Sequence, residues 1–379
     1  MIMNKYNWIG IIIVLLSQTV FATPTLLWKK TLQSSIISVS QSAKRNLTSS
    51  HPIFPIGMIH TKKNVYMFDT NAKEIQKISL EMDDLTTISD NGQMMARLIN
   101  QHIIISKMNQ NMMLDIPLNT LHSVVLPQHL IFSLSPDGQT FVLISWFAKT
   151  IHIYHSGQLT ASYQEHELDL RGSQISFSKD SSHAVIHIPN WGAGKGQVIY
   201  YNRYGNKAWQ FEYHGNKADV DMSSDASTIL VLTSDHYFLL DHTGQVQYDK
   251  QLDSSETAAD LSGDGQTFVQ FNPSNCQLTC MNLSTGTTLW SNQIQPVHDQ
   301  LCELGSLHVS ETGTYNFISM LKDWTQKNNQ STLYVFDRFG KLIWEHAFQL
   351  NYLNILSSTD ESWFVGTGGN QACLYYMNK

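Results

Sequence analysis

The chain has 379 residues, of which 42% are hydrophobic and 15% are charged, and its formal net charge is −7. This composition is typical of a globular protein with a large core, and it excludes a disordered chain and one made only of membrane-spanning segments. The mildly acidic balance also argues against nucleic acid as the main partner, because phosphate binding requires clustered Lys and Arg.

Residues 1–22 have the pattern of a secretory signal peptide. Lys5 supplies a positive charge, an apolar run extends from Trp8 to Leu16, and Val20-Phe21-Ala22 provides a cleavage pattern. The apolar run is shorter than the about 18 residues that an uncleaved membrane anchor needs. We therefore expect cleavage after Ala22, a single domain over residues 23–379, and export to the periplasm or the exterior without a stable membrane anchor.

A short pattern recurs along the chain: an apolar residue, a serine, a polar turn and an apolar strand. LSPDGQTFVLIS begins at Leu134, and LSGDGQTFVQFN begins at Leu261. The Asp-Gly pairs suit tight hairpins and do not continue into the acidic pattern of a calcium loop. The repeated serines are Ser89, Ser135, Ser178, Ser223, Ser262, Ser310 and Ser357.

A second strand pair follows most of these hairpins, with a turn glycine and an aromatic residue four positions later. The segment from Ser331 to His346, STLYVFDRFGKLIWEH, is the clearest example. Successive repeated serines are 39 to 48 residues apart. A period of this length made only of strands and turns predicts an all-β fold, a β-propeller with two inner and two outer strands in each blade.

The number of blades depends on the two ends of the chain. Segment 36–40, segment 53–61 as its second strand, and an outer hairpin over 65–78 supply one unit before Ser89, which makes eight units. The last unit begins near Leu353 and runs out after three strands, whereas the segment from Pro24 to Gln33 resembles Thr287 to Gln295. We therefore predict an eight-bladed β-propeller that is closed by the N-terminal strand pairing with the last blade, with seven blades as the alternative.

The outer strand pairs resemble the repeat of quinoprotein-type (PQQ-like) propellers over roughly half of the chain, a likeness that rests on turn glycines and tryptophans. The serine hairpins are similar to those of WD-repeat propellers. The resemblance implies that the repeat tryptophans dock one blade against the next. The residues that carry it are Asn202, Gly205 and Trp209; Asn282, Thr285, Gly286 and Trp290; Asp337, Gly340 and Trp344; and Trp28.

Quinoprotein dehydrogenases of that family hold their cofactor with adjacent cysteines, a calcium site and a catalytic aspartate. This chain has no Cys-Cys pair, and no stretch matches the segment that carries the aspartate. We therefore expect a non-catalytic member without a cofactor. The resemblance also extends to the eight-bladed lipoprotein of the bacterial outer-membrane β-barrel assembly machine, but this chain lacks the lipid-bearing cysteine.

Four cysteines are present, and an oxidising compartment would allow them to pair. Cys276 and Cys302 are the candidate disulfide, because both fall in loops of one repeat region. The alternative is that the cysteines stay reduced, with Cys280 and Cys373 as buried thiols in or beside strands.

The 16 histidines do not indicate a metal site. His152 and His155 point to opposite faces of a strand, and His183 and His187 share a face but stand about 13 Å apart. We expect no metal.

One face of the propeller collects two sets of loops, those between the second and third strands of a blade and those between blades. Trp191 and Trp324 lie in the first set, and Trp146 just precedes another such loop. The loops of the second set are acidic and include Glu165, Glu167 and Asp169. Exposed aromatic anchors within an acidic rim are typical of a partner surface. The alternative is that the loops are simply polar and the tryptophans pack locally.

The sequence thus predicts a non-enzymatic, monomeric module that binds a basic protein or peptide, or acts as a scaffold. The alternative is an enzyme or small-molecule binder that uses the axial channel of the propeller, with hydrolase or lyase chemistry assembled from several blades.

Overall fold

The computed structural model describes residues 24–31, 36–41, 57–61, 64–68, 74–79, 85–90, 92–107, 112–120, 126–189, 195–214, 218–252, 257–294, 302–321, 330–349, 353–358, 360–368 and 371–377. The expected signal peptide and two of the proposed anchors, Trp191 and Trp324, lie outside these residues. The described part is all-β: its helices are two short 3₁₀ turns, η1 (Leu118–Thr120) and η2 (Pro127–His129). None of the helices in this part is long and apolar enough to span a bilayer.

The described strands form eight four-stranded sheets, and seven of these are built from four consecutive strands. All of the pairings are antiparallel, as expected for strands that are joined by short turns. The first four of the seven sheets contain β2 (Ile36–Gln41), β3 (Gly57–Thr61), β4 (Asn64–Phe68) and β5 (Glu74–Ser79); β6 (Thr86–Ile88), β7 (Met94–Ile99), β8 (His102–Lys107) and β9 (Met112–Pro117); β10 (Leu130–Leu134), β11 (Thr140–Ser145), β12 (Thr150–His155) and β13 (Gln158–Gln164); and β14 (Gln174–Phe177), β15 (His183–Ile188), β16 (Gly196–Asn202) and β17 (Lys207–Tyr213).

The remaining three consecutive sheets follow in the C-terminal half and have the same strand order. They contain β18 (Ala218–Met222), β19 (Thr228–Thr233), β20 (His236–Asp241) and β21 (Val246–Gln251); β22 (Ala258–Leu261), β23 (Thr267–Asn272), β24 (Gln277–Asn282) and β25 (Thr287–Gln293); and β26 (Leu304–Val309), β27 (Tyr315–Leu321), β28 (Ser331–Asp337) and β29 (Leu342–Phe348).

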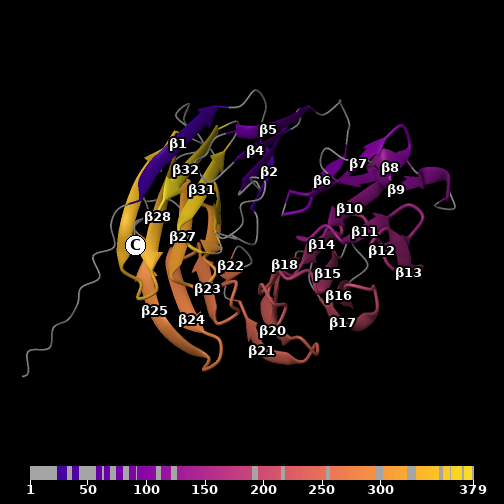
Figure 1. Ribbon diagram of the computed structural model, residues 1–379. Helices are drawn as coiled ribbons and strands as arrows, with labels where there is room; N and C mark the ends of the chain where they lie inside the picture. The colour runs from indigo at the N-terminus through magenta and orange to yellow at the C-terminus, as the bar shows by residue number, and fades with distance from the viewer. Residues whose placement is uncertain are drawn as a thin grey trace, which may run out of the picture.

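The eighth sheet combines the two ends of the chain. Strands β30 (Asn354–Ser357), β31 (Trp363–Gly368) and β32 (Gln371–Tyr376) are completed by β1 (Thr25–Thr31), in the order β1-β32-β31-β30. The β1 strand runs antiparallel to β32, with Trp28 opposite Leu374. Figure 1 shows the indigo β1 beside the yellow β32.

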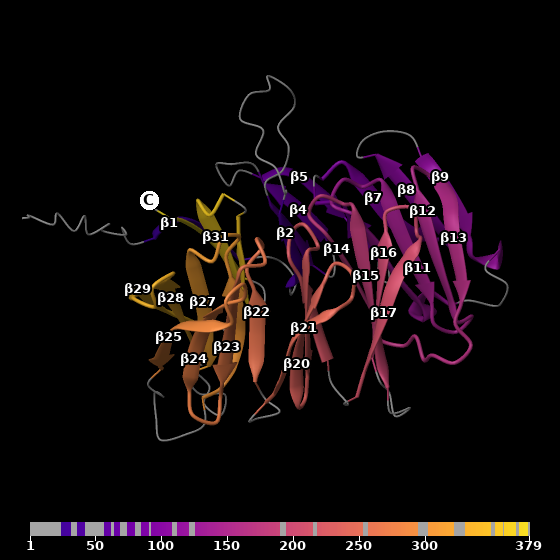
Figure 2. The same ribbon diagram turned by 90° about the horizontal axis from the view of Figure 1, so that it is seen from below.

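The first strands of successive sheets lie next to each other. Contacts link β6 to β10, and then β14, β18, β22, β26 and β30 in turn. The sheet of β2–β5 lies between β31 and the sheet of β6–β9 in both views (Figures 1 and 2). The sheets are thus arranged radially, with the first strand of each innermost. Apolar side chains fill the spaces between neighbouring sheets, as Val142 and Ile144 do against Ile186 and Ile199.

The serine hairpins form as the sequence predicts, through one local hydrogen-bond unit. The Ser135 hydroxyl donates to the Asp137 carboxylate at 2.6 Å and accepts the Thr140 N–H at 2.9 Å. In the last sheet the serine with this role is Ser358, which donates to Asp360 at 2.7 Å. The expected Ser357 is therefore one position too early, because Ser357 ends β30 and its side chain turns toward the neighbouring inner strand.

The tryptophans of the outer strands connect neighbouring sheets. Trp209 on β17 donates from Nε1 to the His242 carbonyl in the next sheet at 2.9 Å. Trp290 on β25 donates to the Arg338 carbonyl at 3.0 Å. Trp344 packs against Tyr375 of the following sheet, with the ring centroids 5.1 Å apart. For Trp28, the structure describes the strand but not the side chain.

Cys276 and Cys302 form a disulfide, with their Cα atoms 5.6 Å apart. Cys276 lies in the loop between β23 and β24, and Cys302 lies just before β26, so the bond joins a loop within one sheet to the connection leading into the next. Cys280 and Cys373 are buried free thiols.

Candidate functional site

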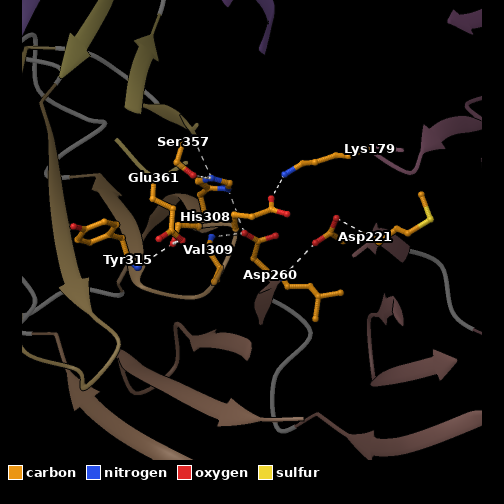
Figure 3. A network of polar contacts seen from close by, with 12 residues as sticks. Lys179, Asp221, Asp260, His308, Val309, Tyr315, Ser357 and Glu361 are labelled. Carbon is orange, nitrogen blue, oxygen red and sulfur yellow. Dashed lines mark hydrogen bonds and ion pairs between the residues drawn. The ribbon is translucent and has the colours of Figure 1, made fainter. Parts of the chain in front are cut away.

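A ladder of polar side chains runs along the inner strands of four consecutive sheets (Figure 3). An innermost strand is a sheet edge, so half of its N–H groups have no partner within the sheet. Side chains from the preceding inner strand accept three of these N–H groups. The acceptor and donor pairs are Asp221 with Leu261 (3.3 Å), Asp260 with Val309 (2.6 Å), and His308 with Ser357 (3.2 Å).

Asp221 and Asp260 form a hydrogen-bonded carboxyl pair within this ladder. Burial raises the pKa of Asp221 well above its usual value, and the neighbouring Asp260 carboxylate raises it further. Both effects favour the protonated form of Asp221, because two like charges at one buried site repel each other.

His308 lies between Asp260 and Ser357. Its Nε2 is 2.8 Å from the Ser357 hydroxyl and also accepts the Ser357 N–H. The proton of the neutral ring therefore sits on Nδ1, which faces the Asp260 carboxylate at 3.5 Å. This order of hydroxyl, imidazole and carboxylate matches that of a serine nucleophile with its base and orienting acid. Ser357 is only 6% exposed.

An ion pair joins two sheets that are not neighbours. Lys179, in the turn after β14, contacts the Glu311 carboxylate in the turn after β26 (Figure 3). Gly263 permits this approach, because a Cβ at that position would overlap the Glu311 carboxylate. Burial raises the pKa of Asp90 to about 6, although the Lys179 charge acts in the opposite direction. These three ionisable groups lie at the serine-hairpin end of the inner strands.

Glu361 supplies a missing part of one hairpin. The turn after Ser310 carries Thr312 where five of the other serine hairpins have aspartate. The Ser310 hydroxyl donates instead to Glu361 of the next sheet at 2.6 Å, and the Thr312 N–H donates to the same oxygen at 2.8 Å. Glu361 is buried, and its role is to connect two neighbouring sheets.

An exposed aromatic cluster lies on the opposite loop face, between β11 and β12. Trp146 is half-buried, because its Nε1 donates to the Gln128 carbonyl at 3.0 Å and its ring packs edge-on against His129. The most exposed ring is instead that of Phe147, which is 56% exposed and stacks on His129 at 4.9 Å. The expectation that Trp146 is an exposed anchor is therefore wrong in detail, and Phe147 has that position.

The acidic segment beside this cluster is partly neutralised. Asp169 forms an ion pair with Arg171, whose hydrogen bond lowers the pKa of the Asp169 carboxyl. Lys149 Nζ, from the turn between β11 and β12, donates to the His166 carbonyl in the connection after β13 at 2.7 Å. Glu167 is exposed, and Glu165 is half-buried nearby. The structure thus places Glu165, Glu167 and Asp169 next to the Phe147 cluster, with less net negative charge than the sequence suggests.

Among the described residues, no group of three or more His, Cys, Asp and Glu side chains is arranged to hold a metal ion. Sequence reasoning missed the inner-strand ladder, although a signal for it exists. The residue two positions before each repeated serine is polar in six successive sheets: Thr87, Ser133, Ser176, Asp221, Asp260 and His308.

No protein-family model and no curated protein matches this sequence. Solved structures do resemble it. The WD40 domain of SCAP from fission yeast superposes with a TM-score of 0.60 at 10% identity, covering 94% of this chain and 98% of that one. The Dos1 propeller gives 0.56 at 10% identity, covering 94% and 96%. A eukaryotic initiation factor gives 0.54 at 13% identity, covering 89% and 82%. The chain therefore has the β-propeller fold, with WD40-type propellers among its structural neighbours.

Proposed function

We propose that this protein is an exported, non-enzymatic β-propeller that binds a protein or peptide through the loop face carrying Phe147. The observation that carries the proposal is the exposed Phe147 ring, which is held in place by His129 and Trp146. A rigid exposed aromatic ring costs little conformational entropy on binding and buries a large apolar area, which suits it to anchor a partner. The WD40-type neighbours support an interaction or scaffold role by fold analogy alone.

The charges around Phe147 favour a basic partner. Within the part of the chain that the structure describes, no ion pair involves Glu165 or Glu167, whereas Asp169 is paired with Arg171. A Lys or Arg that flanks an apolar anchor residue of the partner would therefore meet two carboxylates beside the aromatic ring. Charges at such a rim mainly set the association rate and its dependence on salt.

The test compares three forms of the tagged protein as baits in envelope extract of its native host. Phe147→Asp removes the anchor, and Leu289→Asp is the matched control, since Leu289 is 51% exposed on the outer strand β25. Proteins captured by the unmodified chain and by Leu289→Asp should be lost with Phe147→Asp. Quantitative mass spectrometry of the eluates measures this. Equal capture by all three baits, with circular dichroism showing that each is folded, would count against the proposal.

A second candidate function is favoured by the Ser357, His308 and Asp260 geometry. We infer that this set could support acyl transfer, with Ser357 as nucleophile and His308 as base, which is the axial-channel enzyme expected as the alternative. A fluorophosphonate probe should then label Ser357, and His308→Gln should abolish the labelling. If no labelling occurs, or if labelling persists in Ser357→Ala, acyl transfer at Ser357 is contradicted. The ladder then has only the structural role of capping the N–H groups of the inner strand edges.

Export is part of the proposal and has its own support. The disulfide between Cys276 and Cys302 is of a kind that persists in oxidising compartments. Intact-mass analysis of the protein from its host should give a chain that begins at Thr23. A chain that retains residues 1–22 and occurs in the cytosolic fraction would contradict export.

We also propose that the eight sheets close into one ring of eight blades, with repeats of the quinoprotein-like type. The pairing of β1 with β32 and the docking of Trp209 over a turn glycine support this. A chain that starts at Ser34 lacks β1 and should aggregate, because β32 becomes an unpaired edge. Equal stability and solubility of chains that start at Thr23 and Ser34 would contradict closure by β1.

A further inference from the structure

The serine-hairpin turns of four consecutive sheets are linked to one another by backbone hydrogen bonds. The Lys179 N–H donates to the Ser224 carbonyl at 2.8 Å, and the Ser224 N–H donates to the Gly263 carbonyl at 2.6 Å. The Asp264 N–H then donates to the Glu311 carbonyl at 2.7 Å. We call these four turns, at Lys179, Ser224, Gly263 and Glu311, the collar. Each of the four residues directly follows the serine of its hairpin.

The ion pair of Lys179 and Glu311 joins the two ends of the collar. The two turns between them carry the small residues Ser224 and Gly263, and a Cβ at Gly263 would overlap the Glu311 carboxylate. The Lys179 charge also opposes the rise in the pKa of Asp90, which has the same position in the sheet of β6–β9. The Lys179 ammonium group is therefore close to carboxyl groups from two other sheets, over the inner ends of the strands.

The inner-strand ladder lies directly behind the collar (Figure 3). Asp260 precedes Gly263 by three residues, and His308 precedes Glu311 by three residues, which is roughly 10 Å of extended chain. The side chains of His308 and Asp260 are 22% and 19% exposed, although both lie on innermost strands. Solvent therefore reaches the ladder through the space between the inner strands, and the collar borders that space at one end.

The ion pair is able to open while the collar stays in place. The side chains of Lys179 and Glu311 are 40% and 19% exposed. An ion pair that is partly exposed contributes little free energy and is screened by salt. The turns beneath it are held separately by their backbone hydrogen bonds. Breaking the ion pair therefore requires only rotation of two side chains, which is fast compared with movement of whole sheets.

We propose that the ion pair of Lys179 and Glu311 is a latch over the serine-hairpin end of the ladder, which controls how readily a small molecule reaches Ser357 and His308. With the pair formed, the Lys179 side chain lies across the end of the inner strands. With the pair broken, that side chain turns into solvent and the end is open. The importance of the latch for catalysis rests on the second candidate function, acyl transfer at Ser357. Access itself is independent of whether Ser357 is a nucleophile.

The test measures access to position 357 in the full chain. Ser357→Cys introduces a thiol there, and methyl methanethiosulfonate, a small uncharged reagent, modifies thiols that it can reach. Mass spectrometry of peptides gives the rate of modification at this position. Cys280 and Cys373 are buried free thiols, so their rates report any general loosening of the fold. Should Ser357→Cys not fold, the rate at which diethyl pyrocarbonate modifies His308 provides the same measurement.

Lys179→Met keeps most of the side-chain volume and removes the charge, so it separates a latch from a passive obstruction. It should raise the rate about fivefold, which corresponds to about 1 kcal/mol. Glu311→Gln should have a similar effect, and the double variant should not exceed either single one. Lys195→Met is the matched control, because it breaks the ion pair of Lys195 with Glu212 and should leave the rate unchanged.

Two results would overturn the latch. One is an unchanged rate in Lys179→Met. The other is a parallel rise in the modification of Cys280 and Cys373, because the variant would then loosen the whole domain. A fluorophosphonate probe that fails to label Ser357 contradicts acyl transfer alone, since the thiol reagent measures access without any reaction of the serine.

Discussion

The Trp209 indole nitrogen and the His242 carbonyl oxygen lie 2.9 Å apart across the boundary between two sheets. The same ring stacks on Tyr200 of its own sheet at 4.8 Å and lies against Gly244 of the next. One side chain thus combines aromatic packing within a sheet, a hydrogen bond between sheets and close contact with a turn. Removing it should affect all three, and groups that share partners in this way do not contribute additively.

Replacing Trp209 by alanine is expected to destabilise the protein strongly. A cavity between the two sheets and the unpaired His242 carbonyl should together lower the free energy of unfolding by about 3 kcal/mol. Trp209→Phe keeps most of the packing and loses the hydrogen bond, so it should cost about 1 kcal/mol. Urea denaturation measures both values. Equal effects of the two substitutions would show that the hydrogen bond, and not the packing, dominates.

Gly244 and Gly286 provide a matched pair for the role of the turn glycine. Both have positive φ, +82° and +66°, but only Gly244 has a ring against it. Gly286→Ala should cost about 1 kcal/mol from backbone strain alone. Gly244→Ala should cost about 3 kcal/mol, because the methyl group also displaces Trp209. Similar losses at the two positions in thermal denaturation would contradict docking through this contact.

Removing the disulfide should lower the free energy of unfolding, because the unfolded chain gains conformational freedom when the crosslink is absent. Cys276 and Cys302 are 26 residues apart, and closing a loop of that length is expected to stabilise by about 3 kcal/mol. The double variant Cys276→Ser, Cys302→Ser should therefore unfold at a lower denaturant concentration. A reductant should shift the unmodified chain in the same way and leave the double variant unchanged. If reductant also shifts the double variant, the stabilisation has another source.

Asp90 should make stability depend on pH in the mildly acidic range. Burial raises its pKa from 3.8 to about 6 in the folded chain, so the folded state holds this proton more tightly than the unfolded state. The protonated Asp90 carboxyl makes its full contribution to the free energy of unfolding below about pH 4. This contribution is lost as the pH rises toward 6 and beyond. Asp90→Asn should therefore be the more stable chain at pH 7, by up to about 3 kcal/mol, and equal to the unmodified chain near pH 3.5.

Denaturation midpoints across this pH range provide the check. The difference between Asp90→Asn and the unmodified chain should grow from pH 4 to pH 6 and then level off. A constant difference across the whole range would mean that the substitution acts through packing and not through the proton.

The repeat architecture was predictable because it depends on local chemistry. The hydrogen bonds of one hairpin join Ser135, Asp137 and Thr140, which lie within six residues of one another. A short stretch of sequence therefore specifies the whole hairpin. The same reasoning placed one serine wrongly. Ser357 and Ser358 are adjacent, and only the strand end decides which of them begins the turn.

The inner-strand ladder could not be predicted in the same way. Asp221, Asp260 and His308 lie on strands 39 and 48 residues apart in sequence, and each resembles an ordinary polar residue in a strand. Their contacts arise only from how neighbouring sheets are placed around the axis. The Phe147 surface was missed for a related reason, since the burial of Trp146 depends on Gln128 and His129 from the preceding connection.

The pairing of β1 with β32 means that the strand synthesised first finds its partner last. A nascent chain interrupted anywhere before Gln371 leaves β1 without its neighbour, and β31 without a strand on one side. Contacts between β1 and β32 also join segments that lie far apart in the sequence, which makes these contacts slow to form. A chain in which β1 and β32 have not yet paired therefore exposes strand edges that chaperones and proteases can recognise.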